Sequence, residues 1–285
     1  MDTRILSFMN VIDLSIIIVN YNTKALLWDS IDSIIENTKG LEYEILVIDN
    51  GSTDGSQDMI RERYPHIILH DNKENVGFSK ANNQGYRMSR GNYLLFLNSD
   101  TIIVNSAIKT MINYLMDHSE VGIVGPKIYN AEKQPSRSFM RFLDAKVLFL
   151  GTKYLSWCIN TAKYRLHYDT YDYTTTQNVP WLSGACLMIP RNVFEEVGCF
   201  DEGYFLYLED MDLCMQVKKK GYANIFLPSA EIIHLFGGST KHQKTQVNKI
   251  YKDSARHYFR KNFSVIQYLL ARLYYGVNAI SHMGS

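Results

Sequence analysis

The sequence predicts an α/β fold built on a mostly parallel central sheet with helices on both faces. Continuous apolar, β-branched runs, typical of strands covered on both faces, alternate with segments whose apolar residues recur at helical spacing. Polar residues follow three of these runs directly, at the strand ends beyond which such sheets bind ligands. A chain of 285 residues can bury a substantial core, in one large domain or in one domain with an appendage.

The expected strands and helices alternate through the first half of the chain. Buried strands are expected at Leu14–Val19, Glu44–Asp49, His66–His70 and Tyr93–Asn98. The helices are expected to follow a cap at Asn22 or Thr23, to follow the turn Gly51–Gly55, to run over Phe78–Arg90, and to begin near Ala107. This alternation indicates a parallel sheet.

The regular alternation stops after Gly125-Pro126, and residues 130–180 are mixed in character. An apolar run then extends from the Trp181 segment to Ile189. Beyond it we expect a short helix at Arg191–Val197, a helix at Glu209–Lys220 closed by Gly221, and two short strands, Asn224–Leu227 and Glu231–Leu235, around Pro228.

The charge and the cysteine content exclude some classes of function. Thirty basic residues against twenty-nine acidic ones give a formal net charge of +1, which argues against a broad nucleic-acid surface. Four cysteines without a CxxC pair argue against a zinc knuckle or a disulfide framework. The N-terminus has no signal-peptide pattern, and the last five residues resemble a cloning remnant. We therefore expect a cytoplasmic location, either free or peripheral at the inner face of the cytoplasmic membrane.

Three polar clusters are expected at the ligand edge of the sheet: Asn20-Tyr21, Asp49-Asn50 and Asn98-Ser99-Asp100. A carboxylate at Asp100 together with an imidazole at His234 suits Mn²⁺ or Mg²⁺ bridging a diphosphate. The alternatives stay open at this point, because aspartates at strand ends often belong to turns and a single histidine is more often structural.

A further carboxylate cluster lies at the start of the helix expected from Glu209. Glu209, Asp210 and Asp212 occupy three of four successive positions, where the helix dipole alone would favour them. The functional alternative is a general base that deprotonates an acceptor hydroxyl while a metal-bound diphosphate leaves.

Seven segments then carry a family resemblance: LSIIIVNYN, EILVIDNGSTDGS, NVGFSKANNQG, LLFLNSD, VPWLSGACLMIPR, FDEGYFLYLEDMDLCMQVKKKGY and IIHLFGGST. In this order they resemble family 2 glycosyltransferases of the GT-A fold, in particular bacterial rhamnosyltransferase-like members that build O-antigen, capsule or other cell-wall polysaccharides. The resemblance covers roughly Ile12 to Thr240.

The resemblance implies an inverting, metal-dependent transfer from a nucleoside-diphosphate sugar. The favoured donor is dTDP-rhamnose, with UDP-sugars as the alternative, and the acceptor is a saccharide or a lipid-linked saccharide. Val19 and Tyr21 would line the nucleoside site, and Asp49 would accept a hydrogen bond from the base N3–H. Asn50 and the stretch Gly77–Lys80 would lie near the base, ribose or phosphate.

The resemblance also implies the reacting groups. Asn98-Ser99-Asp100 matches a DxD motif whose first Asp is replaced, so that Asp100 and His234 would hold Mn²⁺ or Mg²⁺ with one negative charge fewer beside them. Asp210 matches the general base, and Glu209 would orient the acceptor. The sugar and acceptor pocket would be shaped by Trp181, Gly184 and Ala185.

Particular residues argue against the alternative functions. A nucleotidyltransferase or a dinucleotide-dependent dehydrogenase needs a glycine-rich loop after the first strand, where VNYNTKALL has no glycine. A non-catalytic module that binds nucleotide-sugars would not need Asp100 or the Glu209-Asp210 pair. No nucleic-acid partner is expected.

We therefore expect a GT-A domain over residues 1–240, with a nucleotide-binding half at about 12–126 and an acceptor half at about 127–240. A C-terminal helical extension would cover 241–280, followed by the remnant at 281–285. The extension combines a basic amphipathic helix from Thr245 with an apolar stretch from Phe263. Packing on the domain, a homodimer interface and peripheral docking on a membrane remain open, whereas a spanning helix is disfavoured by Arg272 and by the short run.

Overall fold

The computed structural model describes residues 12–144, 172–235 and 244–281. The first half contains β1 (Leu14–Asn20), α1 (Lys24–Asn37), β2 (Tyr43–Asp49), α2 (Ser56–Arg63), β3 (Ile68–Asp71), α3 (Phe78–Met88), β4 (Tyr93–Asn98), β5 (Thr101–Val104) and α4 (Ala107–Asp117). The second half contains β6 (Val121–Tyr129), β7 (Phe139–Met140), β8 (Gln177–Asn178), β9 (Trp181–Leu182), β10 (Cys186–Pro190), α8 (Arg191–Glu196), α9 (Glu209–Lys219), β11 (Ala223–His234), α10 (Lys244–Asn262) and α11 (Val265–Ser281).

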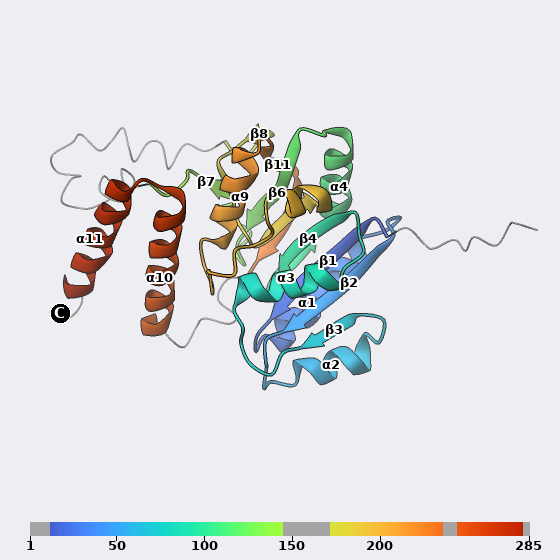
Figure 1. Cartoon of the computed structure of the whole chain (residues 1–285). Helices are drawn as coiled ribbons and strands as arrows, with labels where there is room; N and C mark the ends of the chain where they lie inside the picture. Colours follow the sequence, from blue (N-terminus) through green and yellow to red (C-terminus); the bar gives the residue numbers. More distant parts are fainter. Residues whose placement is uncertain (1–11, 145–171, 236–243, 282–285) are drawn as a thin grey trace, which may run out of the picture.

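One central sheet organises the described residues (Figure 1). Its strand order is β3-β2-β1-β4-β10-β6-β11-β5, and β8 pairs with β11. Strands β3, β2, β1 and β4 are parallel, β10 is antiparallel to both β4 and β6, and β11 runs parallel to β6. The α/β class and the mostly parallel sheet predicted from the sequence are confirmed. Because β6 runs through residue 126, the two expected halves of the domain share this sheet.

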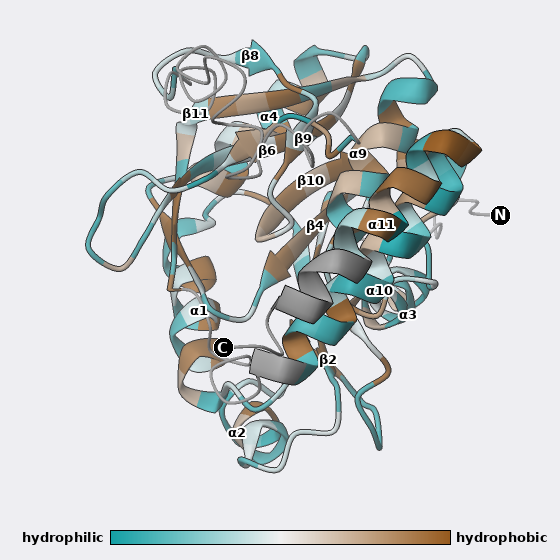
Figure 2. Ribbon diagram, turned by 90° about the vertical axis from the view of Figure 1, so that its left-hand side faces the viewer, coloured by the Kyte–Doolittle hydropathy of each residue, from teal (hydrophilic) through white to brown (hydrophobic). Residues whose placement is uncertain are grey.

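The sheet is covered on both faces, which explains why its strands are continuous apolar runs. Ile16 and Ile18 of β1 pack into a core cluster that includes residues of α1 and α4. Ile17, which points to the opposite face, packs into a second cluster with residues of α3, α8 and α9. Figure 2 shows the resulting hydrophobic colouring along the central strands.

Two strands run through a proline, and one of them corrects a predicted strand limit. Strand β6 continues through Gly125-Pro126 to Tyr129. A Cβ on Gly125 would come within 2.9 Å of Leu182, so close packing requires this glycine. The two short strands expected around Pro228 are one strand, β11, whose register against β6 shifts between Leu227 and Glu231. A local irregularity of this kind accommodates a proline without ending the strand.

The C-terminal segment forms two helices that lie side by side next to α9 (Figure 1). Ala255, Tyr258 and Phe259 of α10 are fully buried in a cluster with Tyr204 and Met211. Of the alternatives left open by the sequence, packing on the domain is therefore what α10 does. Within the described ranges, no helix combines the length and the apolar character needed to cross a membrane.

Candidate active site

The carboxyl ends of β1 and β2 form a closed polar cluster. Register places Asn20 beside Asp49, and the Asn20 side-chain amide donates to Asp49 Oδ2 at 2.7 Å. Asp49 Oδ1 accepts from the Ser52 backbone N–H and from the Gln57 amide, both at 2.8 Å. Asp49 is 0% exposed, so a carboxylate with about four acceptor positions already uses three of them inside the protein. Its hydrogen bond to a base N3–H stays a prediction, and a base would take the fourth position or replace Gln57.

A hydroxyl pair connects this cluster to the end of β4. The Thr23 hydroxyl donates to Asn20 Oδ1 at 2.6 Å and lies 2.8 Å from the Ser99 Oγ. Thr23 is the residue at the N-terminal boundary of α1, but its side chain makes no capping bond there. The predicted position of the cap, at Asn22 or Thr23, is therefore confirmed at Thr23, but the hydroxyl does not cap α1, because strand-end partners take it. The contribution of Ser52, Gln57 and the Thr23 hydroxyl to this cluster was missed from the sequence, where nothing distinguishes these residues from other polar residues of turns and first helical turns.

Asn50 and Gly77, which are both expected near the nucleotide, lie in contact with each other. The Asn50 amide donates to the Asn75 Oδ1 at 3.2 Å and to the Gly77 carbonyl at 3.4 Å. Gly77 has a φ of +89°, and a Cβ there would come within 2.8 Å of the Phe205 carbonyl oxygen. Glycine is therefore required at this position by both conformation and space. Lys80 is exposed in the first turn of α3.

Asp100 and His234 meet across the sheet. His234 Nε2 lies 3.0 Å from Asp100 Oδ1 and 3.4 Å from the Asn98 side-chain nitrogen. Both residues are 8% exposed. They are 134 positions apart in the chain and come together because β11 ends beside β5, with His234 opposite Thr101.

This pair fits a divalent cation. Neighbouring ligands of an octahedral ion with bonds of about 2.1 Å lie about 3 Å apart, close to the separation of these two atoms. Carboxylate oxygen and imidazole nitrogen are ligands that Mn²⁺ accepts. In the described part of the chain, no group of three or more His, Cys, Asp or Glu side chains could hold a metal by itself. Further ligands would have to be diphosphate oxygens and water.

Asp210 is held by the backbone of a distant loop. The Gly184 N–H donates to Asp210 Oδ2 at 2.8 Å, and the Met211 N–H donates to Oδ1 at 2.7 Å. A Cβ on Gly184 would lie 3.0 Å from Asp210 Oδ2, so a side chain here would push the carboxylate out of this position. Burial raises the pKa of Asp210, against the hydrogen bonds from these two N–H groups, which lower it.

Glu209 lies in a different environment. It is 6% exposed, and its Oε2 has no hydrogen-bond partner among the residues that the structure describes. Burial, followed by the charge of Asp210, raises the pKa of Glu209. Because two N–H donors stabilise the charge of Asp210 and no donor in the described ranges reaches Glu209 Oε2, the pair favours a proton on Glu209 and an ionised Asp210.

A short path connects Asp210 with the end of β4. Gly184, which binds Asp210, precedes Ala185, whose carbonyl accepts the Asn98 N–H at 3.0 Å. Strand β10 then begins at Cys186, opposite Leu97. The sequence suggested that Gly184 and Ala185 shape a pocket, and the structure adds that they join the start of α9 to the Asn98-Ser99-Asp100 turn.

The loop 200–208 leads into α9 through two unusual residues. Tyr207 and Leu208 have φ values of +73° and +68°, a conformation that costs non-glycine residues roughly 1–2 kcal/mol each. The Ser254 hydroxyl of α10 donates to the Leu206 carbonyl at 2.8 Å, and the Phe205 carbonyl accepts the Phe78 N–H at 2.7 Å. Contacts on both sides therefore hold the loop in this conformation.

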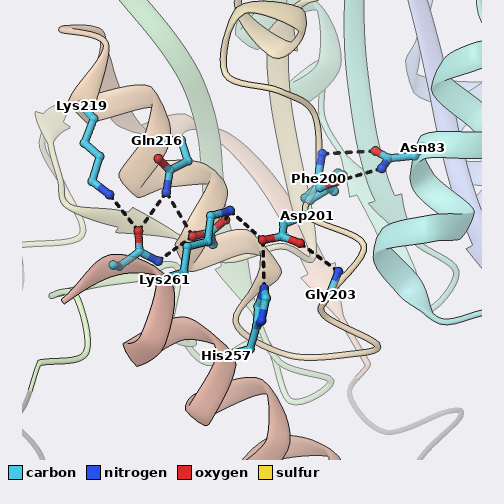
Figure 3. A network of polar contacts seen from close by, with 10 residues as sticks. Asn83, Phe200, Asp201, Gly203, Gln216, Lys219, His257 and Lys261 are labelled. Carbon is cyan, nitrogen blue, oxygen red and sulfur yellow. Dashed lines mark hydrogen bonds and ion pairs between the residues drawn. The ribbon is translucent and has the colours of Figure 1, made fainter. Parts of the chain in front are cut away.

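A polar network fastens α10 to the loop and to α9 (Figure 3). Lys261 Nζ lies 2.7 Å from both Asp201 Oδ2 and Asp212 Oδ2. His257 Nε2 lies 2.9 Å from Asp201, and Asn262 donates to Asp212 Oδ1 at 2.7 Å. Burial alone would raise the pKa of Asp201, but the hydrogen bonds from Lys261 and His257 hold it at about 2.

This network corrects one expectation for the acidic cluster at the start of α9. Asp212 is 2% exposed and its carboxylate accepts from α10, so it neither caps α9 nor lies open to an acceptor. The other predicted residues differ in accessibility. Tyr21 is 36% exposed, whereas Val19 and Trp181 are half-buried.

Comparisons with known proteins identify the family to which this chain is similar. Residues 15–198 match the profile of glycosyl transferase family 2. An N-acetylglucosaminyl-diphospho-decaprenol L-rhamnosyltransferase of Mycobacterium tuberculosis is 29% identical over 69% of this chain and 67% of its own. Rhamnosyltransferase WbbL of Escherichia coli is 23% identical over 67% of this chain and 82% of its own.

The fold is also found among solved structures. The crystal structure of GalNAc-T7 with UDP, GalNAc and Mn²⁺ superimposes with a TM-score of 0.62 at 16% identity. The match covers 94% of this chain and 55% of that one. The likeness confirms the GT-A fold.

Proposed function

Because this chain belongs to glycosyl transferase family 2, we propose that it transfers rhamnose from a dTDP-sugar to a saccharide, with inversion at the anomeric carbon. Family membership makes it a glycosyltransferase rather than a non-catalytic binding module. The observation that carries the mechanism is the position of Asp210, which accepts the N–H of its neighbour Met211 and the N–H of Gly184, on a segment that is bonded to the end of β4.

The nucleotide is proposed to bind at the carboxyl ends of β1 and β2. Val19 and Tyr21 would line the nucleoside, while Asn50 and the α3 N-terminus, from Gly77 to Lys80, would lie near ribose or phosphate. Helix N-termini favour anions, and α3 presents its first turn at this edge. Both thymine and uracil present an N3–H to Asp49, so a UDP-sugar is the alternative donor.

The diphosphate is proposed to lie at Asp100 and His234. These two side chains, 3.0 Å apart, would hold Mn²⁺ or Mg²⁺ together with diphosphate oxygens. When bound, the ion neutralises the charge that develops on the leaving diphosphate. The Asn98 side chain contributes no charge, so the diphosphate itself would supply part of the attraction for the cation.

Asp210 is the proposed general base. Its carboxylate would accept the proton of an acceptor hydroxyl as that oxygen attacks the anomeric carbon from the face opposite the diphosphate. The N–H groups of Gly184 and Met211 stabilise the ionised form and fix its orientation. Glu209, protonated beside it, would donate a hydrogen bond to the acceptor, and Trp181, Gly184 and Ala185 would border the sugar.

The acceptor class follows from the relatives. The Mycobacterium tuberculosis relative is named for a sugar carried on a decaprenyl diphosphate, and we propose a polyprenyl-diphosphate-linked saccharide here. The expected setting is synthesis of a cell-surface polysaccharide at the cytoplasmic face of the membrane.

One experiment tests the proposal directly. The protein is mixed with Mn²⁺ and with dTDP-rhamnose, UDP-glucose, UDP-N-acetylglucosamine or GDP-mannose, and binding is measured by calorimetry. Tightest binding of dTDP-rhamnose, followed by product formation on a polyprenyl-diphosphate-linked N-acetylglucosamine, is the expected result. Tightest binding of GDP-mannose would contradict both the proposed dTDP-sugar donor and the proposed role of Asp49 in binding the base.

A further inference from the structure

The outer face of α11 is apolar and exposed. Five large aliphatic side chains point away from the protein: Val265 is 72% exposed, Ile266 71%, Leu269 53%, Leu270 38% and Leu273 59%. The opposite side of the same helix carries Ala271 and Tyr275, which are buried in the cluster that joins it to α10. Figure 2, in which α11 faces the viewer, shows hydrophobic segments along it. A contiguous exposed patch of this kind marks an interaction surface.

The neighbouring helix presents positive charge. Lys249, Lys252, Arg256 and Arg260 follow one another at helical spacing along one side of α10, next to the side that buries Ala255, Tyr258 and Phe259; Lys252 is half-buried and the other three are exposed. Residues 244–281 contain seven Lys and Arg residues and one acidic residue, Asp253, which pairs with Arg256 at 2.7 Å. The whole chain has a net charge of only +1, so positive charge is concentrated on this pair of helices.

We propose that the α10–α11 pair docks on the surface of an anionic lipid bilayer. The aliphatic side chains of α11 would enter the interface, and the basic residues of α10 would contact the headgroups. The positive charge favours an anionic membrane over a second copy of the chain on this face. A second copy would bring the same positive residues to the contact, and these would repel one another. Within the described residues no helix could span the membrane, so the contact is peripheral.

Docking would place the site at the membrane. Helix α10 is joined to the loop 200–208 and to Asp212 of α9, so a membrane-bound α10 fixes the start of α9 relative to the lipid surface. This inference goes beyond the proposed function and does not depend on it, since its test uses no substrate.

The test is co-flotation of the full chain with vesicles. Vesicles of phosphatidylcholine alone are compared with vesicles that contain equal parts of phosphatidylcholine and phosphatidylglycerol. The protein is expected to float with the anionic vesicles and to be released as the salt concentration rises. Replacing Lys249, Lys252, Arg256 and Arg260 by Gln should weaken binding by about fivefold for each charge.

A second variant tests the apolar face. The triple replacement Ile266→Ser, Leu269→Ser and Leu273→Ser should weaken binding by about tenfold for each side chain. Matched controls replace exposed residues elsewhere: Ile35→Ser and Met116→Ser for the apolar face, and Lys39, Lys73, Lys109 and Lys133 to Gln for the charges. The controls should bind like the unaltered chain. Circular dichroism establishes that each variant is folded.

Three results would overturn the proposal. They are no flotation with anionic vesicles, equal flotation with neutral vesicles, and loss of binding in the control variants to the same extent. Dimerisation that the α11 triple replacement abolishes, without any vesicle binding, would assign the face to a second copy of the chain.

Discussion

The Gly184 backbone N–H donates to Asp210 Oδ2 at 2.8 Å, across 26 positions of the chain. This contact connects the start of α9 to the segment that enters β10, and through Ala185 it reaches Asn98 at the end of β4. Two successive residues, Gly184 and Ala185, therefore couple the orientation of the proposed base to the edge where the donor is proposed to bind.

Replacing Asp210 with Asn should stop catalysis while leaving the donor site intact. The Asn side chain keeps the shape and can still accept the Gly184 N–H, but it cannot take a proton, so turnover should fall by about 10²-fold or more. Donor affinity, measured by calorimetry, should be unchanged. Glu209→Gln is the comparison and should act more on acceptor KM. Normal turnover by Asp210→Asn together with an inactive Glu209→Gln would show that Glu209 is the general base and that Asp210 orients the acceptor.

Gly184→Ala should reduce turnover although it replaces no titratable residue. The new Cβ would lie 3.0 Å from both Asp210 Cβ and Oδ2, so the carboxylate must move by a few tenths of an ångström or more. Displacement of a catalytic group by about 1 Å costs up to about 10²-fold, and we expect a loss of roughly tenfold to a hundredfold in kcat. The kcat and the donor Kd are measured together. A variant with the full kcat would show that this contact does not position the base.

Glu209→Gln should stabilise the protein increasingly as pH rises. The pKa of Glu209 is raised above its ordinary value of 4.5, so the folded chain holds a proton that the unfolded chain releases. The unaltered protein therefore loses stability as pH rises from about 4.5 toward the folded pKa, and the Gln variant avoids this loss.

Thermal unfolding at pH 5 and pH 8, without metal or nucleotide, measures this effect. The two proteins should unfold at similar temperatures at pH 5, and the variant should gain about 2–4 °C at pH 8, as expected for about 1 kcal/mol in a chain of this size. Glu36→Gln, at an exposed position of α1, should show no such dependence. A constant difference between Glu209→Gln and the unaltered chain would mean that Glu209 is ionised in the folded state.

Asp100→Ala and His234→Ala should weaken metal binding in the presence of a nucleoside diphosphate. Each variant removes one of two groups that lie 3.0 Å apart, so Asp100→Ala should abolish transfer and His234→Ala should raise the Mn²⁺ concentration needed for it. Thermal shift with dTDP and increasing Mn²⁺ gives a readout apart from activity. His66→Ala, at an exposed position, is the control. An unchanged Mn²⁺ titration in His234→Ala would return this histidine to a structural role.

Lys261→Met should destabilise the domain, because it leaves the carboxylate of Asp212, with a side chain 3% exposed, without its cation. Removing one partner of a buried pair costs about 3–5 kcal/mol, and since Asn262 and Gln216 still donate to Asp212, we expect about 2 kcal/mol. Urea unfolding measures the loss. Adding Asp212→Asn should recover part of it, whereas Arg260→Met, one residue away and exposed, should cost little. Equal losses in the two Met variants would remove the special role of Lys261.

The sequence by itself determined the class of the fold, most of the strands and helices, and the strand-end position of Asp49, Asn98 and Asp100. These features follow from local patterns: an apolar run long enough for a covered strand, and a polar residue where that run stops. The start of α9 at Glu209 was also predicted correctly, because helical spacing and the preference of a first turn for acidic residues act over a few residues.

Only the tertiary structure decided which of these residues meet. Asp100 reaches His234 because β11 passes Pro228 without ending and finishes beside β5. Asp210 reaches Gly184 because β10 inserts antiparallel between β4 and β6, and Asp212 binds Lys261 rather than capping α9. Strand order and the close approach of backbones depend on how whole surfaces pack, and no local pattern of residues encodes contacts over such separations.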